Sequence, residues 1–145
     1  MTYNILISDP LSEDGIFPLR EAEGFNIVVD TELTPDQLAE KIGEFDALLV
    51  RSQTQVTREI IEKATNLKII GRAGVGVDNI DLPAATERGI IVVNAPDGNT
   101  NSAAEHTIAM LMSLARKIPQ AFHSLKNKKW DRKTYIGVEV KNKTL

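Results

Sequence analysis

The fold is decided by the stretch Leu67-Lys-Ile-Ile-Gly-Arg-Ala-Gly-Val-Gly-Val-Asp-Asn-Ile-Asp-Leu-Pro-Ala-Ala-Thr-Glu-Arg-Gly-Ile-Ile-Val-Val93. It opens and closes on short apolar runs, residues 67–70 and 90–93, which have the length and the branched side chains of buried strands. A short helix is expected between them, near residues 82–88, and Gly89 would end it because glycine tolerates the left-handed backbone at a helix C-terminus. A strand, a helix and a strand in this order predict two parallel strands joined by a crossover.

Three earlier apolar runs, at residues 3–7, 25–29 and 47–50, extend this pattern toward the N-terminus. They are near-continuous rather than alternating, which is typical of strands buried on both faces. Helical patterns separate them: one begins at Thr34-Pro35-Asp36-Gln37, which has the features of a capped helix start, and another runs from Thr57 through Ala64. The predicted fold class is therefore α/β, a five-stranded parallel sheet with helices on both faces.

The C-terminal part has a different pattern. Residues 101–118 predict a helix in which Ser102-Ala-Ala-Glu105 would form a capping box, and so few later positions are polar that burial on most sides is expected. A further helix is expected from Pro119, followed by a short strand or arm at residues 135–140. The last residues, Lys143-Thr-Leu145, have the pattern of a strand that is just beginning.

The composition is that of an ordinary globular chain of 145 residues, 42% apolar and 26% charged. It contains no cysteine, and no His-x-x-His or paired-acid spacing suggests a metal cluster, so no metal site is predicted. The first residues carry neither the basic segment of a signal peptide nor a membrane-length apolar run. We therefore expect a cytoplasmic location and no membrane contact.

Charge is divided unevenly along the chain. Residues 1–115 hold 18 acidic and 8 basic side chains, a balance of −10, whereas residues 116–145 hold 2 acidic and 9 basic, a balance of +7. The basic end surrounds Trp130, a pattern that occurs in nucleic-acid-binding proteins, but one aromatic side chain makes no stacking platform. A solvated basic surface is the favoured interpretation, and no nucleic-acid partner is predicted.

Two arginines follow apolar runs directly. Arg51 comes after residues 47–50, and Arg72 comes after residues 67–71. Ligands of an open parallel sheet bind outside the carboxyl ends of its strands, and a guanidinium group matches a carboxylate or a phosphate. The pair predicts a small anionic ligand. The alternative is that each arginine forms an ion pair with a nearby acid, such as Asp46, Asp78 or Asp81.

The glycine-containing loop after Gly71 differs from a dinucleotide-binding fingerprint. From Gly74 it gives G-x-G-x-x-N, with Asn79 in place of the third glycine. We interpret it as an anion-binding turn whose glycines expose backbone N–H groups beside Arg72. Asn99, in a later polar loop, is either a further donor or a plain turn residue. No residue of the chain is predicted to be catalytic.

Residues 71–90 and 94–107 resemble the D-isomer-specific 2-hydroxyacid dehydrogenases, and within that family the phosphoglycerate dehydrogenases. Val50-Arg-Ser-Gln-Thr54 and Leu114-Ala-Arg-Lys-Ile-Pro119 extend the resemblance over essentially the whole chain. It implies a flavodoxin-like substrate domain in residues 1–100, and the crossing helix and arm of a truncated Rossmann cofactor domain in residues 101–145. It also implies NAD as cofactor and oxidation of 3-phosphoglycerate to 3-phosphohydroxypyruvate in serine biosynthesis.

The resemblance assigns roles to particular positions. Arg51 and Ser52 would hold the substrate phosphate, and Arg72 would lie by the carboxylate and the nicotinamide. Threonine is often found in relatives at position 75, where this chain has valine and so lacks a hydroxyl. The implied substrate-binding residues are Arg51, Ser52, Arg72, Gly74 and Asn99, and the implied cofactor-binding residues are Val75 and Thr107.

In the family, the NAD-binding glycine fingerprint and the catalytic Arg, Glu and His lie in later sequence, so this chain alone is expected to be inactive. A homodimer through residues 101–145 is expected, because an apolar helix favours pairing with a second copy. The alternative function is a non-enzymatic flavodoxin-like anion-binding or signalling module. A receiver module would need an acid for Mg²⁺ where the third strand ends, and Arg51 stands there instead.

Overall fold

Five strands and four helices alternate through the first part of the chain, of which the computed structural model describes residues 2–144. The strands are β1 (Tyr3–Ile7), β2 (Phe25–Val29), β3 (Ala47–Val50), β4 (Ile69–Arg72) and β5 (Ile91–Asn94). The helices are α1 (Glu13–Glu21), α2 (Pro35–Lys41), which continues into the 3-10 turn η1 (Ile42–Glu44), α3 (Arg58–Lys63) and α4 (Leu82–Glu87).

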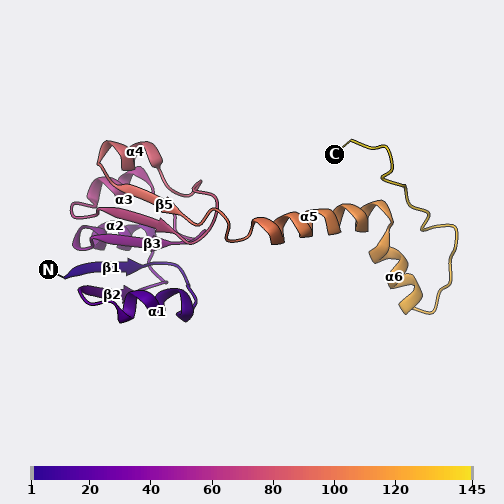
Figure 1. Cartoon of the computed structure of the whole chain (residues 1–145), viewed down its shortest axis with the longest axis horizontal. Coiled ribbons are helices and arrows are strands. Elements are labelled where there is room, and N and C mark those ends of the chain that lie inside the picture. The colour runs from indigo at the N-terminus through magenta and orange to yellow at the C-terminus, as the bar shows by residue number, and fades with distance from the viewer. Residues whose placement is uncertain (1, 145) are drawn as a thin grey trace. The chain divides into compact units, whose positions relative to one another are not determined.

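All strand pairs are parallel, and the order across the sheet is β2-β1-β3-β4-β5 (Figure 1). This is the order of a doubly wound, flavodoxin-like fold, in which the order of connection reverses between β1 and β3. The predicted α/β fold class is confirmed.

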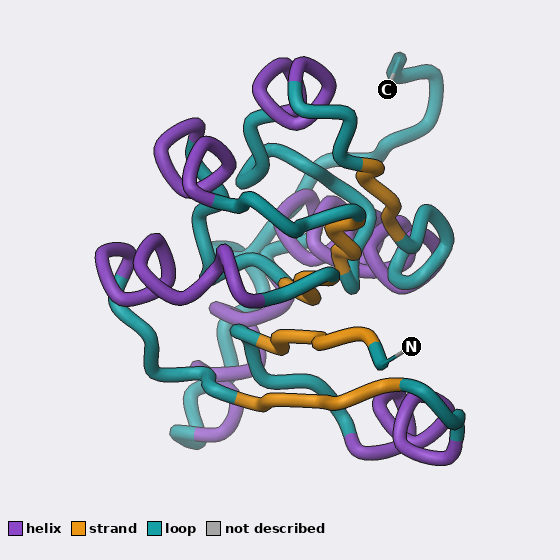
Figure 2. Tube along the Cα trace, turned by 90° about the vertical axis from the view of Figure 1, so that its left-hand side faces the viewer, coloured by secondary structure: helices purple, strands orange, loops and turns teal. Residues whose placement is uncertain are grey.

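Alternate residues of each strand face opposite layers of helices. Leu6, Leu48 and Ile70 are in register across the sheet, are fully buried, and pack into one core with residues of α2, α3 and α4. The side chains of Ile7 and Leu49 point to the opposite face, where α1 packs. Figure 2 shows helices on both sides of the strands. The near-continuous apolar runs follow from this double coverage.

Two helix ends form as their sequences predict. Thr34 and Gln37 make the reciprocal bonds of a capping box at the start of α2, and Gly89 has a φ of +68° after α4. Thr57 caps α3 without a side-chain hydrogen bond.

The fourth strand was predicted at residues 67–70 but lies two residues later. Leu67 is buried in the core before the strand begins, so its apolar character reports burial rather than strand pairing.

The chain divides into two compact units, residues 1–99 and 100–145. The second contains α5 (Thr100–Ala115) and α6 (Ile118–Lys126). The predicted single helix over 101–118 is wrong at its end, because Lys117 takes a left-handed φ of +51° and starts a new helix. It is also wrong at its start: Ser102 lies inside the first turn of α5 and not at its cap. The assignment of the units to substrate and cofactor domains stays a prediction.

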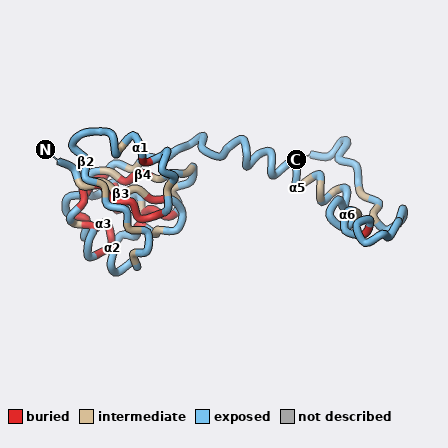
Figure 3. Tube along the Cα trace, turned by 90° about the horizontal axis from the view of Figure 1, so that it is seen from below, coloured by how far each residue is buried: buried red, intermediate tan, exposed pale blue. Residues whose placement is uncertain are grey.

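Burial differs sharply between the units. No residue of α5 is buried, as the pale blue course of this helix shows (Figure 3), although its sequence predicts burial on most sides. Residues 135–140 form an arm without a strand, attached where the Val138 N–H donates to the Ala115 carbonyl oxygen at 2.8 Å. Gly137 lies so close to this carbonyl that a Cβ would collide with it. Of the strand start predicted at residues 143–145, Leu145 lies outside the described residues.

Candidate anion-binding site

The carboxyl ends of β3 and β4 bring the two predicted arginines to one edge of the sheet. Val50, the last residue of β3, is in register with Arg72, the last residue of β4. Arg51 follows Val50 at once, so the two arginines start from the ends of neighbouring strands. Neighbouring strands of a sheet lie roughly 4.8 Å apart. Ser52 follows in the same loop. Doubly wound sheets bind ligands at this edge.

Two of the three acids that could have neutralised these arginines pair with other cations. The third, Asp78, lies beside Gly76, as Arg72 Nη1 does, but forms no ion pair among the described residues. Asp46 pairs with Lys68, Nζ to Oδ1 at 2.7 Å, and this hydrogen bond keeps the pKa of the Asp46 carboxyl below its usual value. Asp81 pairs with Arg58. Within residues 2–144 neither Arg51 nor Arg72 forms an ion pair, so both positive charges are available to a ligand.

Arg72 lies against the glycine-containing loop that follows it. A Cβ added at Gly74 would sit 2.6 Å from Arg72 Nη1, so glycine there leaves room for the guanidinium group. The Gly74 N–H donates to the Arg72 carbonyl oxygen at 2.9 Å, so this amide is engaged inside the loop and not offered to a ligand as predicted. In the described part of the chain, the N–H groups of Val75 and Gly76 bond to no protein acceptor.

A buried acid shapes the loop that carries Arg51. Asp9, which follows β1 and Ser8, is 1% exposed. Its carboxylate accepts from the backbone N–H groups of Arg51 at 2.6 Å and Gln53 at 3.2 Å, and from both the N–H and the hydroxyl of Thr54, the latter at 2.6 Å. The acid therefore ties the end of β1 to the loop after β3, across the point where the sheet order reverses.

Burial and hydrogen bonding act on Asp9 in opposite directions. Burial alone would raise its pKa, but the hydrogen bonds from the Thr54 hydroxyl and from three backbone N–H groups outweigh that effect and lower the pKa below its ordinary value. The group is therefore a carboxylate at neutral pH, with its oxygens occupied by the loop.

Asn79 joins this loop to Arg72. Its side chain is buried, and its Nδ2 donates to the carbonyl oxygens of Arg51 at 2.8 Å and Thr54 at 2.7 Å. Its Oδ1 accepts from Arg72 Nε at 2.9 Å. The sequence marked Asn79 only as a departure from a glycine fingerprint, and no local pattern announces contacts across 25 and 28 residues.

The remaining predicted residues are placed less directly. Asn99 is the last residue of the first unit and lies in the loop after β5. Val75, in the loop after β4, is 37% exposed, and its carbonyl oxygen accepts from Asn94 Nδ2 at 2.6 Å. Thr107 lies in α5 of the second unit, where its hydroxyl donates to the Ala103 carbonyl oxygen at 2.7 Å. Asp9 and Asn79 are thus the two supporting residues that the sequence did not identify.

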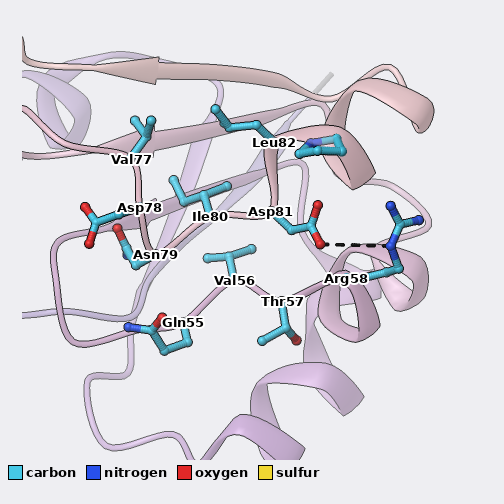
Figure 4. A pocket seen from close by; sticks show the side chains of 11 residues that line it. Gln55, Val56, Thr57, Arg58, Val77, Asp78, Asn79, Ile80, Asp81 and Leu82 are labelled. Carbon is cyan, nitrogen blue, oxygen red and sulfur yellow. Dashed lines mark ion pairs between the residues drawn. The ribbon is translucent and has the colours of Figure 1, made fainter.

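Three hollows border these loops. One of about 280 Å³ is lined by Asp9, Gln53 and Thr54 among others, and no cation lines it. Another of about 320 Å³ includes Arg72, Ala73 and Asn94 in its lining. A larger one of about 690 Å³, whose lining includes Asn79 and Arg58, is shown in Figure 4. Its cation, Arg58, is already paired with Asp81 at 3.9 Å and with Glu87 at 2.7 Å. The larger hollow offers an anion no unpaired cation, so the arginine edge is the better candidate.

Other kinds of site find little support in the described residues. Among residues 2–144 no group of three or more His, Asp or Glu side chains is arranged to hold a metal ion. None of the helices in that range is long and apolar enough to cross a membrane.

Known proteins resemble this chain over most of its length. The chain is 57% identical over 141 residues to a D-3-phosphoglycerate dehydrogenase of Methanocaldococcus jannaschii, and 52% identical over 140 residues to one of Archaeoglobus fulgidus. Each alignment covers 97% of this chain but only 26% of the relative, so the chain spans about a quarter of their length.

A solved structure shares the fold. The NAD⁺-bound 3-phosphoglycerate dehydrogenase of Entamoeba histolytica matches with a TM-score of 0.69 and 32% identity, over 81% of this chain and 40% of that one. The match favours the dehydrogenase interpretation over a signalling module.

The family model described as the catalytic domain of D-isomer specific 2-hydroxyacid dehydrogenases matches residues 5–137, well over half of the chain. This confirms the identification made from the loops at residues 71–107, and the chain belongs to the D-isomer-specific 2-hydroxyacid dehydrogenase family.

Proposed function

We propose that this chain is the substrate-binding portion of an NAD-dependent D-3-phosphoglycerate dehydrogenase, an oxidoreductase that converts 3-phosphoglycerate to 3-phosphohydroxypyruvate in serine biosynthesis. The observation that carries the proposal is the placement of Arg51 and Arg72 at neighbouring strand ends, with no acidic partner in the described residues. The substrate has two anionic groups, a phosphate and a carboxylate, and so needs two cationic contacts. The names of the relatives support the same substrate.

The proposed roles follow from position in the two loops. Arg51 and Ser52 bind the phosphate, with Asn99 as a further donor. Arg72, whose guanidinium group lies against Gly74, binds the carboxylate. A hydrogen bond to a charged group contributes about 1.5–3 kcal/mol, so losing either guanidinium should be measurable even in a weak complex.

The NAD cofactor fits these residues poorly. The loop after β4 has buried Asn79 where a fingerprint needs glycine, and α4 is only six residues long, so the described residues offer no cradle for a pyrophosphate. Val75 and Thr107 are proposed only to approach the nicotinamide end. We assign substrate binding and orientation to this chain and the hydride-transfer machinery to residues outside it, so the chain alone is inactive.

We also propose that a second copy of the chain covers α5. Ile108, Met112 and Leu114 of this helix are 48%, 36% and 76% exposed. Burying each such side chain contributes roughly 1.5–3 kcal/mol, and a two-fold pair is the commonest closed arrangement. Residues 101–145 would form the homodimer contact. The cytoplasmic location and the lack of nucleic-acid and membrane partners stay predictions.

A titration with 3-phosphoglycerate, followed by amide chemical shifts, tests the substrate assignment. Binding should be weak, with a Kd on the order of millimolar, because the proposed contacts are few and the chain spans only about a quarter of its curated relatives. Arg51→Ala should weaken it about tenfold. Arg88→Ala, an exposed arginine after α4 at the opposite end of the strands, is the matched control and should change nothing. Equal affinity of the Arg51→Ala and wild-type chains would refute the assignment.

A further inference from the structure

Among the described residues, the Asn79 side chain hydrogen-bonds to both arginine-bearing segments. It is 5% exposed and lies between β4 and α4. Through Nδ2 it reaches the carbonyls of Arg51 and Thr54, and through Oδ1 it reaches Arg72 Nε. The orientation of its amide is fixed by its partners, because two carbonyls require a donor and a guanidinium requires an acceptor.

The loop after β3 is held from two sides by complementary groups. The Asp9 carboxylate, which can only accept, accepts from the N–H groups of Arg51, Gln53 and Thr54. Asn79 Nδ2, which can only donate, donates to the carbonyl oxygens of Arg51 and Thr54. The backbone of Arg51 is therefore bound at both its N–H and its C=O, which fixes where its side chain starts.

Arg72 is constrained by the same amide. Its Nε is occupied by Asn79, and Gly74 leaves room for Nη1. A ligand must then approach the terminal nitrogens of the fork, and the direction of that fork is set by Asn79. One buried amide thus fixes the start of one arginine and the direction of the other.

We propose that Asn79 is a positioning residue that sets the spacing of Arg51 and Arg72 for a ligand with two anionic groups. This inference rests on the proposed function, since it takes both arginines as ligand contacts. Asn79 touches no ligand itself. Its effect on affinity passes through Arg51 and Arg72, and this separates it from a residue that only stabilises the fold.

The Asn79 contact has a loop half, to the carbonyls of Arg51 and Thr54, and an arginine half, to Arg72 Nε. Two variants of the 145-residue chain separate these halves. Asn79→Ala removes both. Asn79→Asp keeps an acceptor for Arg72 Nε but faces the carbonyls of Arg51 and Thr54 with oxygen, so it disrupts only the loop half. In ¹⁵N spectra, Asn79→Ala should shift both the Arg72 Nε–Hε signal and the amides of residues 51–54. Asn79→Asp should shift the amides but leave the Arg72 Hε protected from exchange.

A double-variant cycle with 3-phosphoglycerate tests the positioning role. Asn79→Ala should weaken binding about tenfold in the wild-type background, because it releases a charged contact. In the Arg72→Ala background the same change should cost only about threefold, because one of the two groups it positions is already gone. Thermal unfolding of every variant verifies that it is folded at the titration temperature.

The outcomes separate this inference from the proposed function. Equal costs of Asn79→Ala in both backgrounds, or no cost in the wild type, would overturn the positioning role and leave the substrate assignment intact. Failure of the wild type to bind, or of the arginine variants to weaken binding, would sink the proposed function instead. In that case the spectra still test the positioning role. An unmoved Arg72 Nε–Hε signal in Asn79→Ala would show that Asn79 does not direct the Arg72 side chain.

Discussion

Replacing Asp9 should destabilise the first unit in a way that depends on pH. Its carboxylate accepts four hydrogen bonds from the loop at residues 51–54, and the residue is 1% exposed. Asp9→Ala leaves these donors without their acceptor. At about 1–3 kcal/mol per unsatisfied buried donor, with water reaching the exposed end of the loop, we expect a loss of about 2–4 kcal/mol in the free energy of unfolding. Asp9→Asn retains one acceptor oxygen and should lose about 1–2 kcal/mol.

The sign of the pH dependence follows from the lowered pKa of Asp9. A carboxyl whose folded-state pKa is depressed contributes stability that is present above its unfolded pKa, about 3.9, and is lost as the pH falls through the folded value. The difference between the wild type and Asp9→Asn should therefore be full at pH 7 and should shrink below about pH 4.

Urea unfolding at pH 7 and pH 3, followed by far-UV circular dichroism, measures this difference. Tryptophan fluorescence is unsuitable, because Trp130 lies in the second unit. Glu23→Gln, at an exposed position in the turn before β2, is the control and should leave the urea midpoint unchanged. A wild-type advantage over Asp9→Asn that is the same at both pH values would refute the reasoning, because the charge of the carboxylate would then contribute nothing.

Three further predictions concern function. Gly74→Ala should displace the Arg72 guanidinium and weaken 3-phosphoglycerate binding severalfold, with less than about 1 kcal/mol lost in urea unfolding, because the clash is with a flexible side-chain end; unchanged affinity would contradict the packing argument. The chain should show no NAD-dependent turnover of 3-phosphoglycerate in a spectrophotometric assay, and turnover that survives removal of host enzymes would disprove this. Sedimentation equilibrium should detect a dimer that Met112→Lys weakens, whereas a monomer at high micromolar concentration would exclude the proposed contact.

The fold was predictable because its signal is local. Each strand contains branched apolar residues, and the crossovers at Thr34 and Gly89 carry a start or stop signal, so pattern and structure agree there. The errors fell where one property stood in for another. Leu67 is apolar because it is buried, not because it is paired. At residues 116–118, Arg-Lys-Ile, nothing in the sequence marks the left-handed backbone of Lys117 that ends the helix.

The site was predictable only in part, because its support is not local. Arg51 and Arg72 could be located because each follows a strand, and parallel strands end at one edge. The partners of their loops lie far away in sequence: Asp9 meets Arg51 across 42 residues, and Asn79 meets it across 28. These contacts depend on the registers of β1, β3 and β4, which a single sequence does not specify. An acid just beyond the first strand was visible in the sequence, but the sequence pattern did not indicate its hydrogen-bond partners.

Asp9 and Asn79 position the two arginines without neutralising them, and this explains why this edge of the sheet can bind an anion. Asp9 is a buried negative charge close to Arg51, and an acid in that position could have neutralised the arginine. In the described residues Asp9 forms no ion pair with Arg51. The Asp9 oxygens instead accept from N–H groups and from the Thr54 hydroxyl, so the Arg51 guanidinium takes no part in these hydrogen bonds. Asn79 holds Arg72 with a neutral oxygen, which directs the side chain without cancelling its charge. These hydrogen bonds hold the two loops in place without a ligand, and the positive charge that an anionic ligand requires is not neutralised.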